Sequence, residues 1–160
     1  MNTLKHLKVR YPYMLEGENI GISVPDGWIN IFATLCQEID TLLGSDKQGF
    51  HWQQCKEKFG SARWYWGMAK VKQSLTLDLM SSQGTTRIQA SPKASDPVRA
   101  ALATQLGELI NVAEAQTQRS CIVCGEEGRL DRSVGWVLVL CPAHTLMHQH
   151  DELPRFWSNQ

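Results

Sequence analysis

Three cysteines and one histidine form the pattern in this chain with the most definite chemistry. Cys121 and Cys124 are separated by two residues, sixteen residues follow, and Cys141 and His144 repeat the two-residue spacing. Two residues between ligands let a tight turn direct both side chains at one ion, and three sulfurs with an imidazole suit tetrahedral Zn²⁺. Because such a set leaves no coordination position for water, the sequence predicts a structural zinc site rather than a catalytic one.

The fourth ligand could be either of two histidines. His144 mirrors the spacing of the first pair, whereas His148 follows four residues later, on the same face of a predicted helix. We expect His144 to be the ligand and keep His148 as the alternative. No export signal is evident near Met1, and five cysteines are an odd count, so we expect a cytoplasmic protein whose cysteines bind metal instead of forming disulfides.

The residues around the ligands predict a compact zinc module over residues 120–160. Residues 134–140 are rich in β-branched and aromatic side chains and predict a strand, and turns are predicted at Gly128 and at Arg132-Ser133, so a short hairpin is expected between the two ligand pairs. Pro142 suits the first turn of a helix, where its missing N–H costs nothing. A turn with two ligands, a hairpin and a helix start with two more resembles the layout of treble-clef zinc modules over residues 120–150.

Residues 1–119 are predicted to form an α+β body on which the zinc module docks. Asp26 can cap a helix whose apolar stripe begins at Trp28, includes Cys36 as a core residue, and ends before Gly44. Asp96 and the proline after it start a second helix that runs to about residue 118 and leads directly into the zinc module. A further helix is predicted over residues 47–58, after Ser45.

Alternating residues predict the strands of the body. Trp64 and Trp66 lie on one face of a strand over residues 62–66, with Arg63 and Tyr65 on the other. Leu75, Leu77 and Leu79 alternate with polar residues and predict a second strand with one buried face, and residues 85–90 predict a third. The expected fold is a small antiparallel sheet packed with about three helices, plus the C-terminal treble-clef-like module.

Composition excludes some classes of partner. The formal net charge is zero and no apolar run has the length of a membrane span, so neither bulk attraction to nucleic acid nor a membrane is expected. A local nucleic-acid surface remains an alternative over residues 47–72, where aromatic residues alternate with six basic residues: Lys47, Lys56, Lys58, Arg63, Lys70 and Lys72. A thiol-dependent enzyme is the third alternative, because His51 and Cys55 would meet on one face of the predicted helix.

The leading hypothesis is a non-enzymatic zinc protein that binds a protein partner. The sequence contains no phosphate-binding loop or nucleophile motif, and six tryptophans are more than a core of this size requires. Aromatic and arginine residues dominate interface hot spots. The candidate interaction surface therefore comprises Lys56, Lys58, Arg63, Tyr65 and the tail residues Arg155, Phe156 and Trp157. The sequence does not specify an oligomeric state.

Several short motifs together resemble a group of small uncharacterised zinc-binding proteins from bacteria, prophages and other mobile elements. The motifs are Tyr11-Pro12, Gly27-Trp28, Cys36, Lys56-Glu57-Lys58-Phe59-Gly60, Arg63-Trp64-Tyr65, Cys121-Ile122-Val123-Cys124-Gly125, Gly135-Trp136, Cys141 and His144. The resemblance implies zinc and a mixed α+β body, but no activity. It also suggests the role of a mobile-element inhibitor that acts on a host enzyme or defence system.

Overall fold

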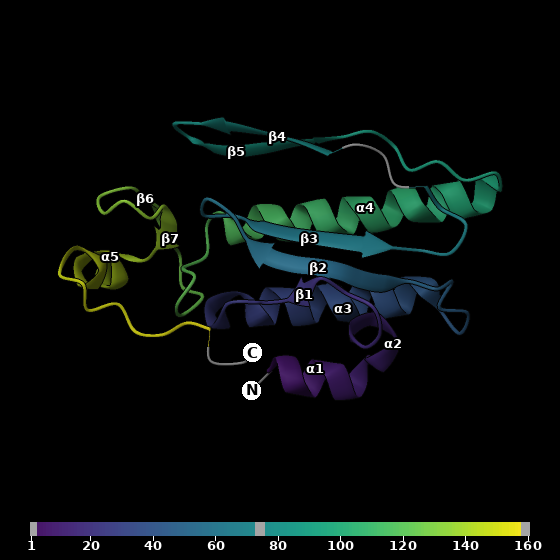
Figure 1. The fold of residues 1–160 in the computed structure, drawn as a ribbon, viewed down its shortest axis with the longest axis horizontal. Helices are drawn as coiled ribbons and strands as arrows, with labels where there is room; N and C mark the ends of the chain where they lie inside the picture. The colour runs from purple at the N-terminus through teal and green to yellow at the C-terminus, as the bar shows by residue number, and fades with distance from the viewer. Residues whose placement is uncertain (1–2, 73–75, 158–160) are drawn as a thin grey trace.

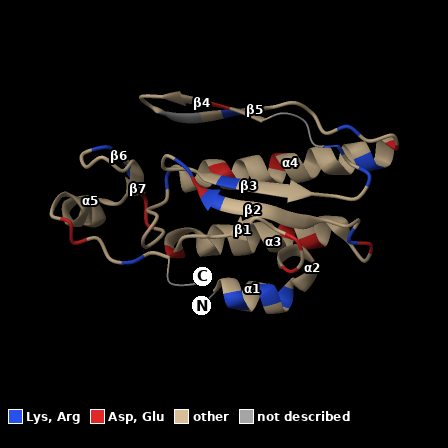
Figure 2. Ribbon diagram, in the orientation of Figure 1, with Lys and Arg blue, Asp and Glu red and all other residues tan. Residues whose placement is uncertain are grey.

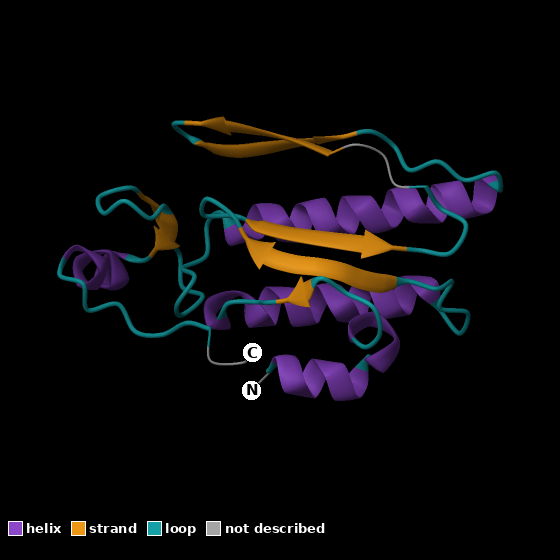
Figure 3. Ribbon diagram, in the orientation of Figure 1, coloured by secondary structure: helices purple, strands orange, loops and turns teal. Residues whose placement is uncertain are grey.

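A computed structural model describes residues 3–72 and 76–157 as an α+β arrangement, in agreement with the predicted fold class (Figures 1 and 3). The helices are α1 (Leu4–Arg10), α2 (Pro12–Leu15), the 3-10 helix η1 (Asp26–Trp28), α3 (Ile29–Leu43), α4 (Pro97–Thr117) and α5 (Pro142–Gln149). The strands are β1 (Gly21–Ile22), β2 (His51–Glu57), β3 (Ala62–Gly67), β4 (Thr76–Ser81), β5 (Gly84–Gln89), β6 (Arg129–Asp131) and β7 (Leu138–Leu140).

The centre of the fold is the sheet β1-β2-β3, in which β1 is parallel to β2 and β2 is antiparallel to β3. Its inner face carries Trp64 and Trp66, as predicted, and β2 adds Trp52, which pairs with Trp66, and Cys55, which pairs with Trp64. Phe32 of α3 packs between Trp52 and Trp64, with ring centroids 5.3 and 5.0 Å apart. These aromatic contacts join α3 to the sheet and form the centre of the core.

Helix α4 covers the free edge of β3. The backbone N–H of Ala62 donates to the Thr117 hydroxyl at 3.0 Å, and that of Trp64 donates to Glu114 Oε1 at 2.6 Å. Side chains of α4 thus replace the hydrogen bonds that a fourth strand would supply, and they satisfy donors that would otherwise be buried without partners. As predicted, this helix begins at Pro97, and Asp96 caps it by accepting from the Val98 N–H at 3.0 Å.

The prediction of a helix over residues 47–58 is wrong, because most of this segment is strand β2. Gln48 and Gly49 have positive φ values of 54° and 66°, so they form a turn before the strand. The β2–β3 register shifts between Trp52 and Gln54. This irregularity places Trp52 and Cys55, three residues apart, on the same buried face. A strand that contains such a bulge imitates the spacing of a helix.

Strands β4 and β5 occur where they were predicted, but they form a separate two-stranded ribbon, and the predicted buried face is wrong. Leu77 and Leu79 are 53% and 49% exposed, and Leu75 lies outside the described residues. Asp78 faces the body instead, because its carboxylate pairs with Arg63 of β3 at 2.9 Å. The ion pair compensates the charge of a guanidinium that is 2% exposed, and Asp78 can face it only if the leucines on either side of Asp78 face outward.

The remaining helices divide into predicted and unpredicted ones. Helix α3 was predicted, and Cys36 lies in the core, but its N-cap residue is Trp28 and the predicted cap, Asp26, begins η1 instead. The helix ends at Leu43, and Gly44 (φ +65°) is its C-cap residue. Helices α1 and α2 were not predicted, although they bury Leu4, Leu7 and Met14. Thr3 caps α1 by accepting from the His6 N–H at 3.2 Å. Helices of seven and four residues, each with two buried residues, leave little periodic signal in a sequence.

Candidate metal centre

Three local structures position the four predicted ligands. Cys121 and Cys124 lie on a turn directly after α4, where Gly125 (φ +83°) donates its N–H to the Cys121 carbonyl at 2.8 Å. The antiparallel β6–β7 hairpin returns the chain to Cys141, which is the N-cap residue of α5. His144 lies in the first turn of that helix. Turn, hairpin and helix start follow one another as the treble-clef-like layout predicts, but the strand predicted over residues 134–140 is shorter and comprises only β7.

The side-chain geometry fits one tetrahedral ion. The ligand atoms of Cys121, Cys124, Cys141 and His144 all lie within 4.8 Å of one another. His144 Nδ1 is 3.4 Å from Cys121 Sγ and 3.1 Å from Cys141 Sγ, and the sulfurs of Cys124 and Cys141 are 3.9 Å apart. Metal–sulfur bonds of about 2.3 Å at tetrahedral angles imply sulfur–sulfur separations of about 3.8 Å. These four residues could therefore hold a metal ion.

The local electrostatics differ among the thiols. Burial raises the pKa of the Cys141 thiol, but the backbone N–H groups of His144 and Ala143 and the neighbouring thiols outweigh burial and hold it below its usual value. Burial and the sulfurs of Cys121 and Cys141 raise the pKa of Cys124 to about 11. A thiol of this kind ionises readily only beside a cation, so binding of a metal at neutral pH is coupled to proton release.

The structure places His148, the alternative ligand, outside the metal group. Its Nδ1 lies 2.7 Å from Oδ2 of Asp131 in β6, and both side chains are 10% exposed. Burial raises the pKa of Asp131, but hydrogen bonds from His148 and Ser133 outweigh it and hold the pKa below the usual value. His148 therefore ties α5 to the hairpin, and His144 is the histidine that faces the cysteines.

The ligand turn packs directly on the body. The Gly27 N–H donates to the Ile122 carbonyl at 3.0 Å, and Trp28 Nε1 donates to the Ser120 carbonyl at 2.9 Å. A Cβ on Gly27 would lie 2.1 Å from the Cys121 carbonyl oxygen. Cys121, Ile122 and residues of β7 belong to the same hydrophobic cluster as the body. The η1 segment, from Asp26 to Trp28, is thus the surface on which the metal turn rests.

The predicted interaction surface divides into buried and accessible residues. Arg63 and Phe156, both expected on the surface, are 2% and 5% exposed, so neither can contact a partner. Arg63 is held by the ion pair with β4, and the Phe156 ring packs 5.3 Å from the Trp157 ring, which is half-buried. Arg155 and Lys58 are exposed, and Lys56 and Tyr65 are half-buried.

The structure buries part of the aromatic surface on which the nucleic-acid alternative depends. Trp52, Trp64 and Trp66 are buried in the core and offer no face for a base. Lys47 is paired with Asp40 at 2.7 Å. Figure 2 shows basic residues scattered over the molecule, among other places on α1, at the end of the sheet near the β2 arrowhead, beside β6 and at the start of α4.

The structure also separates the two residues on which the hypothesis of a thiol-dependent enzyme depends. His51 and Cys55 lie four residues apart on a strand, which separates them by about 13 Å. Cys55 is 1% exposed, and burial raises the pKa of its thiol well above the usual value. A buried thiol with a raised pKa is a poor nucleophile.

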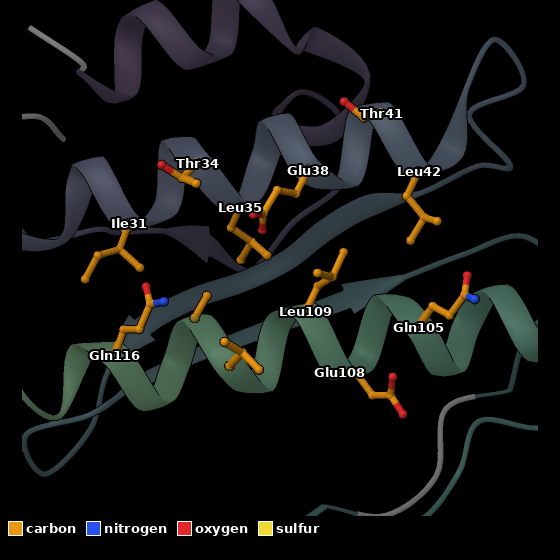
Figure 4. A pocket seen from close by; sticks show the side chains of 12 residues that line it. Ile31, Thr34, Leu35, Glu38, Thr41, Leu42, Gln105, Glu108, Leu109 and Gln116 are labelled. Carbon is orange, nitrogen blue, oxygen red and sulfur yellow. The ribbon is translucent and has the colours of Figure 1, made fainter.

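Sequence reasoning missed an apolar groove between α3 and α4, which run antiparallel (Figure 4). The groove has a volume of about 630 Å³, and the buried side chains of Leu35 and Ala113 form its floor. Val112 at its side is 60% exposed. The remaining lining residues are Ile31, Thr34, Glu38, Thr41, Leu42, Gln105, Glu108, Leu109 and Gln116. An apolar stripe along a helix does not distinguish residues of the core from residues that line a surface groove.

Comparisons with protein-family models, with curated proteins and with solved structures found no match to this chain. Among the described residues, no helix combines the length and apolar character needed to cross a membrane.

Proposed function

We propose that this chain is a non-enzymatic protein, stabilised by structural zinc, that binds a protein partner. Three thiolates and an imidazole favour Zn²⁺ over harder cations, and four protein ligands complete its coordination. On this proposal the ion holds the C-terminal module together, and the binding surface lies elsewhere. Its biological setting, as a mobile-element inhibitor of a host enzyme or defence system, rests on the motif resemblance alone.

The groove between α3 and α4 is the observation that supports partner binding. In Figure 4 Ile31 lies opposite Gln116 at one end of the groove, and Leu42 lies near Gln105 at the other. Two antiparallel helices with apolar side chains between them form the kind of surface that accepts an amphipathic helix. The exposed Val112 and the half-buried Leu42 and Leu109 of the groove would lose contact with water when a partner binds, and this loss of apolar surface to water stabilises a complex.

Charge around the groove limits the class of partner. The charged lining residues are Glu38 and Glu108, one from each helix. An amphipathic helix with an apolar ridge and lysine or arginine at its flanks therefore complements the groove. We propose such a basic amphipathic helix, presented by a partner protein, as the occupant.

The test uses two exposed valines of the same helix. Val112 lines the groove and is 60% exposed, whereas Val98 does not line it and is 77% exposed. Val112→Asp and Val98→Asp therefore add the same charge at similar exposure. The probe is a panel of helical peptides with apolar residues at i, i+4 and i+7 and basic flanks, measured by calorimetry against the zinc-loaded chain.

We expect one or more basic peptides to bind the wild type and Val98→Asp equally. Val112→Asp should weaken binding at least tenfold, or about 1.4 kcal/mol, and peptides with acidic flanks should not bind. A partner captured from the native host supports the proposal only if its purified form shows the same loss with Val112→Asp. Equal binding by both variants, or no peptide binding at all, contradicts the groove as the binding surface.

A further inference from the structure

The groove between α3 and α4 and the candidate metal centre meet at one end of the molecule. The two helices run antiparallel, so the start of α3 lies beside the end of α4, and Figure 1 shows the turn after α4 passing the start of α3. Ile31 and Gln116 lie opposite each other at this end of the groove, the near end. Leu42 and Gln105 mark its far end.

The α4 wall of the near end is bonded to the metal turn, which comprises residues 120–125. The Gln116 carbonyl accepts from the Arg119 N–H and from the Ser120 hydroxyl, both at 3.1 Å. The Arg119 carbonyl accepts from the Gly128 N–H at 2.8 Å, on the far side of the metal turn. A residue that lines the groove is therefore joined directly to the segment that carries Cys121.

The α3 wall of the near end contacts the same turn through η1. The Gly27 N–H donates to the Ile122 carbonyl at 3.0 Å, and the Trp28 indole N–H donates to the Ser120 carbonyl at 2.9 Å. Trp28 is fully buried, so its indole N–H would lose its acceptor in the core if the turn moved away. Ile31 follows Trp28 by three residues, on the same side of the helix.

The position of the metal turn depends on the ligand residues. Two of the four ligands lie on the turn and two at the start of α5, and their ligand atoms lie within 4.8 Å of one another. Binding of an ion to such a group is coupled to folding of the segments that carry it. The Ser120 and Ile122 carbonyls, on either side of Cys121, are therefore placed correctly only when the group holds its ion.

We propose that occupancy of the metal centre sets the spacing of α3 and α4 at the near end of the groove and thereby regulates binding of the partner helix. This inference rests on the proposed function and adds the regulation of its binding site. The Phe32 ring and the Thr117 hydroxyl keep both helices attached to the sheet, so loss of the ion disturbs one end of the groove without unfolding it. The coupling is reciprocal, because a peptide bound in the groove must tighten zinc binding by the same factor.

Amide hydrogen exchange of the full chain, with no peptide present, tests the coupling by itself. Mass spectrometry compares the zinc-loaded chain with the chain after zinc is removed by a chelator. Exchange should become at least about tenfold faster at the near end, in residues 31–35 and 112–116, and change by less than about twofold at the far end, in residues 39–42 and 105–108. Unchanged exchange at the near end overturns the proposal, whether or not any peptide binds.

Two zinc-loaded variants decide the question if removal of zinc unfolds the whole chain. Gly27→Ala places a Cβ 2.1 Å from the Cys121 carbonyl oxygen and displaces the metal turn from η1, whereas a Cβ in Gly107→Ala meets no atom within 4 Å. Near-end exchange should be faster than in the wild type for Gly27→Ala and not for Gly107→Ala. Near-end exchange at the wild-type rate in both variants overturns the proposal.

Calorimetry with the basic helical peptides then measures the consequence for binding. Removal of zinc, and Gly27→Ala with zinc bound, should each weaken peptide binding at least about fivefold, and saturating peptide should raise the zinc affinity by the factor that zinc adds to peptide binding. Equal peptide affinity with and without zinc overturns the regulation. If near-end exchange responds to zinc but no peptide binds the zinc-loaded chain, the proposed binding function fails, and only the coupling between the metal centre and the helices is supported.

Discussion

Gly27→Ala tests whether the metal turn depends on its contact with η1. The added Cβ would lie 2.1 Å from the Cys121 carbonyl oxygen and 2.6 and 2.7 Å from the carbonyl oxygen and carbon of Ile122. All three are backbone atoms, so relief requires the turn to move away from the body. That movement also stretches the hydrogen bond from the Gly27 N–H to Ile122.

The expected magnitude follows from two contributions. Overpacking costs about 1–3 kcal/mol, and a weakened hydrogen bond adds about 0.5–1.5 kcal/mol. The free energy of unfolding should fall by about 2–4 kcal/mol, which corresponds to a Tm lower by about 5–15 °C for a chain of this size. Zinc should also transfer to a chromophoric chelator faster than from the wild type, because Cys121 loses its support.

Gly107→Ala is the matched control. Gly107 lies within α4, and a Cβ there would meet no atom within 4 Å. Alanine in a helix interior should raise stability by about 0.5–1 kcal/mol. Thermal unfolding and chelator kinetics are measured on both variants in the same buffer. If Gly27→Ala is as stable as Gly107→Ala and releases zinc at the wild-type rate, the turn does not rest on η1 as described.

Three further outcomes are expected. Cys124→Ser should lower the zinc content of the purified chain well below one ion per molecule, as elemental analysis would show, and full retention would exclude Cys124 as a ligand. His148→Ala should keep one zinc per chain but lose about 1–3 kcal/mol in a denaturant titration, because Asp131 loses its partner; loss of the zinc would make His148 a ligand. In the folded chain the pKa of Glu114 is about 7, above its ordinary value of 4.5. The stabilisation that Glu114 adds to the free energy of unfolding is therefore fully present below pH 4.5 and is lost as the pH rises through 7. Between pH 5 and pH 8 the wild type should lose up to about 3 kcal/mol more stability than Glu114→Gln, and parallel profiles would contradict the raised pKa.

The sequence predicted the group of three cysteines and one histidine best because ligand spacing is a local property. Cys-x2-Cys places two sulfurs on one turn whatever surrounds it, and Pro142 marks the helix start beside the second pair. The choice between His144 and His148 required the fold. Only the position of Asp131 across the hairpin shows that His148 already has a partner.

The errors arose where tertiary contacts decide between local alternatives. The segment predicted as a helix over residues 47–58 lacks strict alternation because the β2–β3 register shifts between Trp52 and Gln54, and only its pairing with β3 identifies it as a strand. The alternation around Leu77 and Leu79 correctly predicted a strand, but a period of two does not say which face is buried. The buried guanidinium of Arg63, far away in sequence, selects Asp78 as the inward residue.

X-ray absorption at the zinc edge of the purified chain tests the central claim most directly. One zinc per molecule should show three sulfur neighbours at about 2.3 Å and one nitrogen at about 2.0 Å, with no oxygen ligand. A chain that purifies without metal and keeps its stability in chelator would contradict the structural role of zinc. A bound oxygen in place of a sulfur or the imidazole would show that the zinc has an open coordination position, and it would contradict a purely structural site.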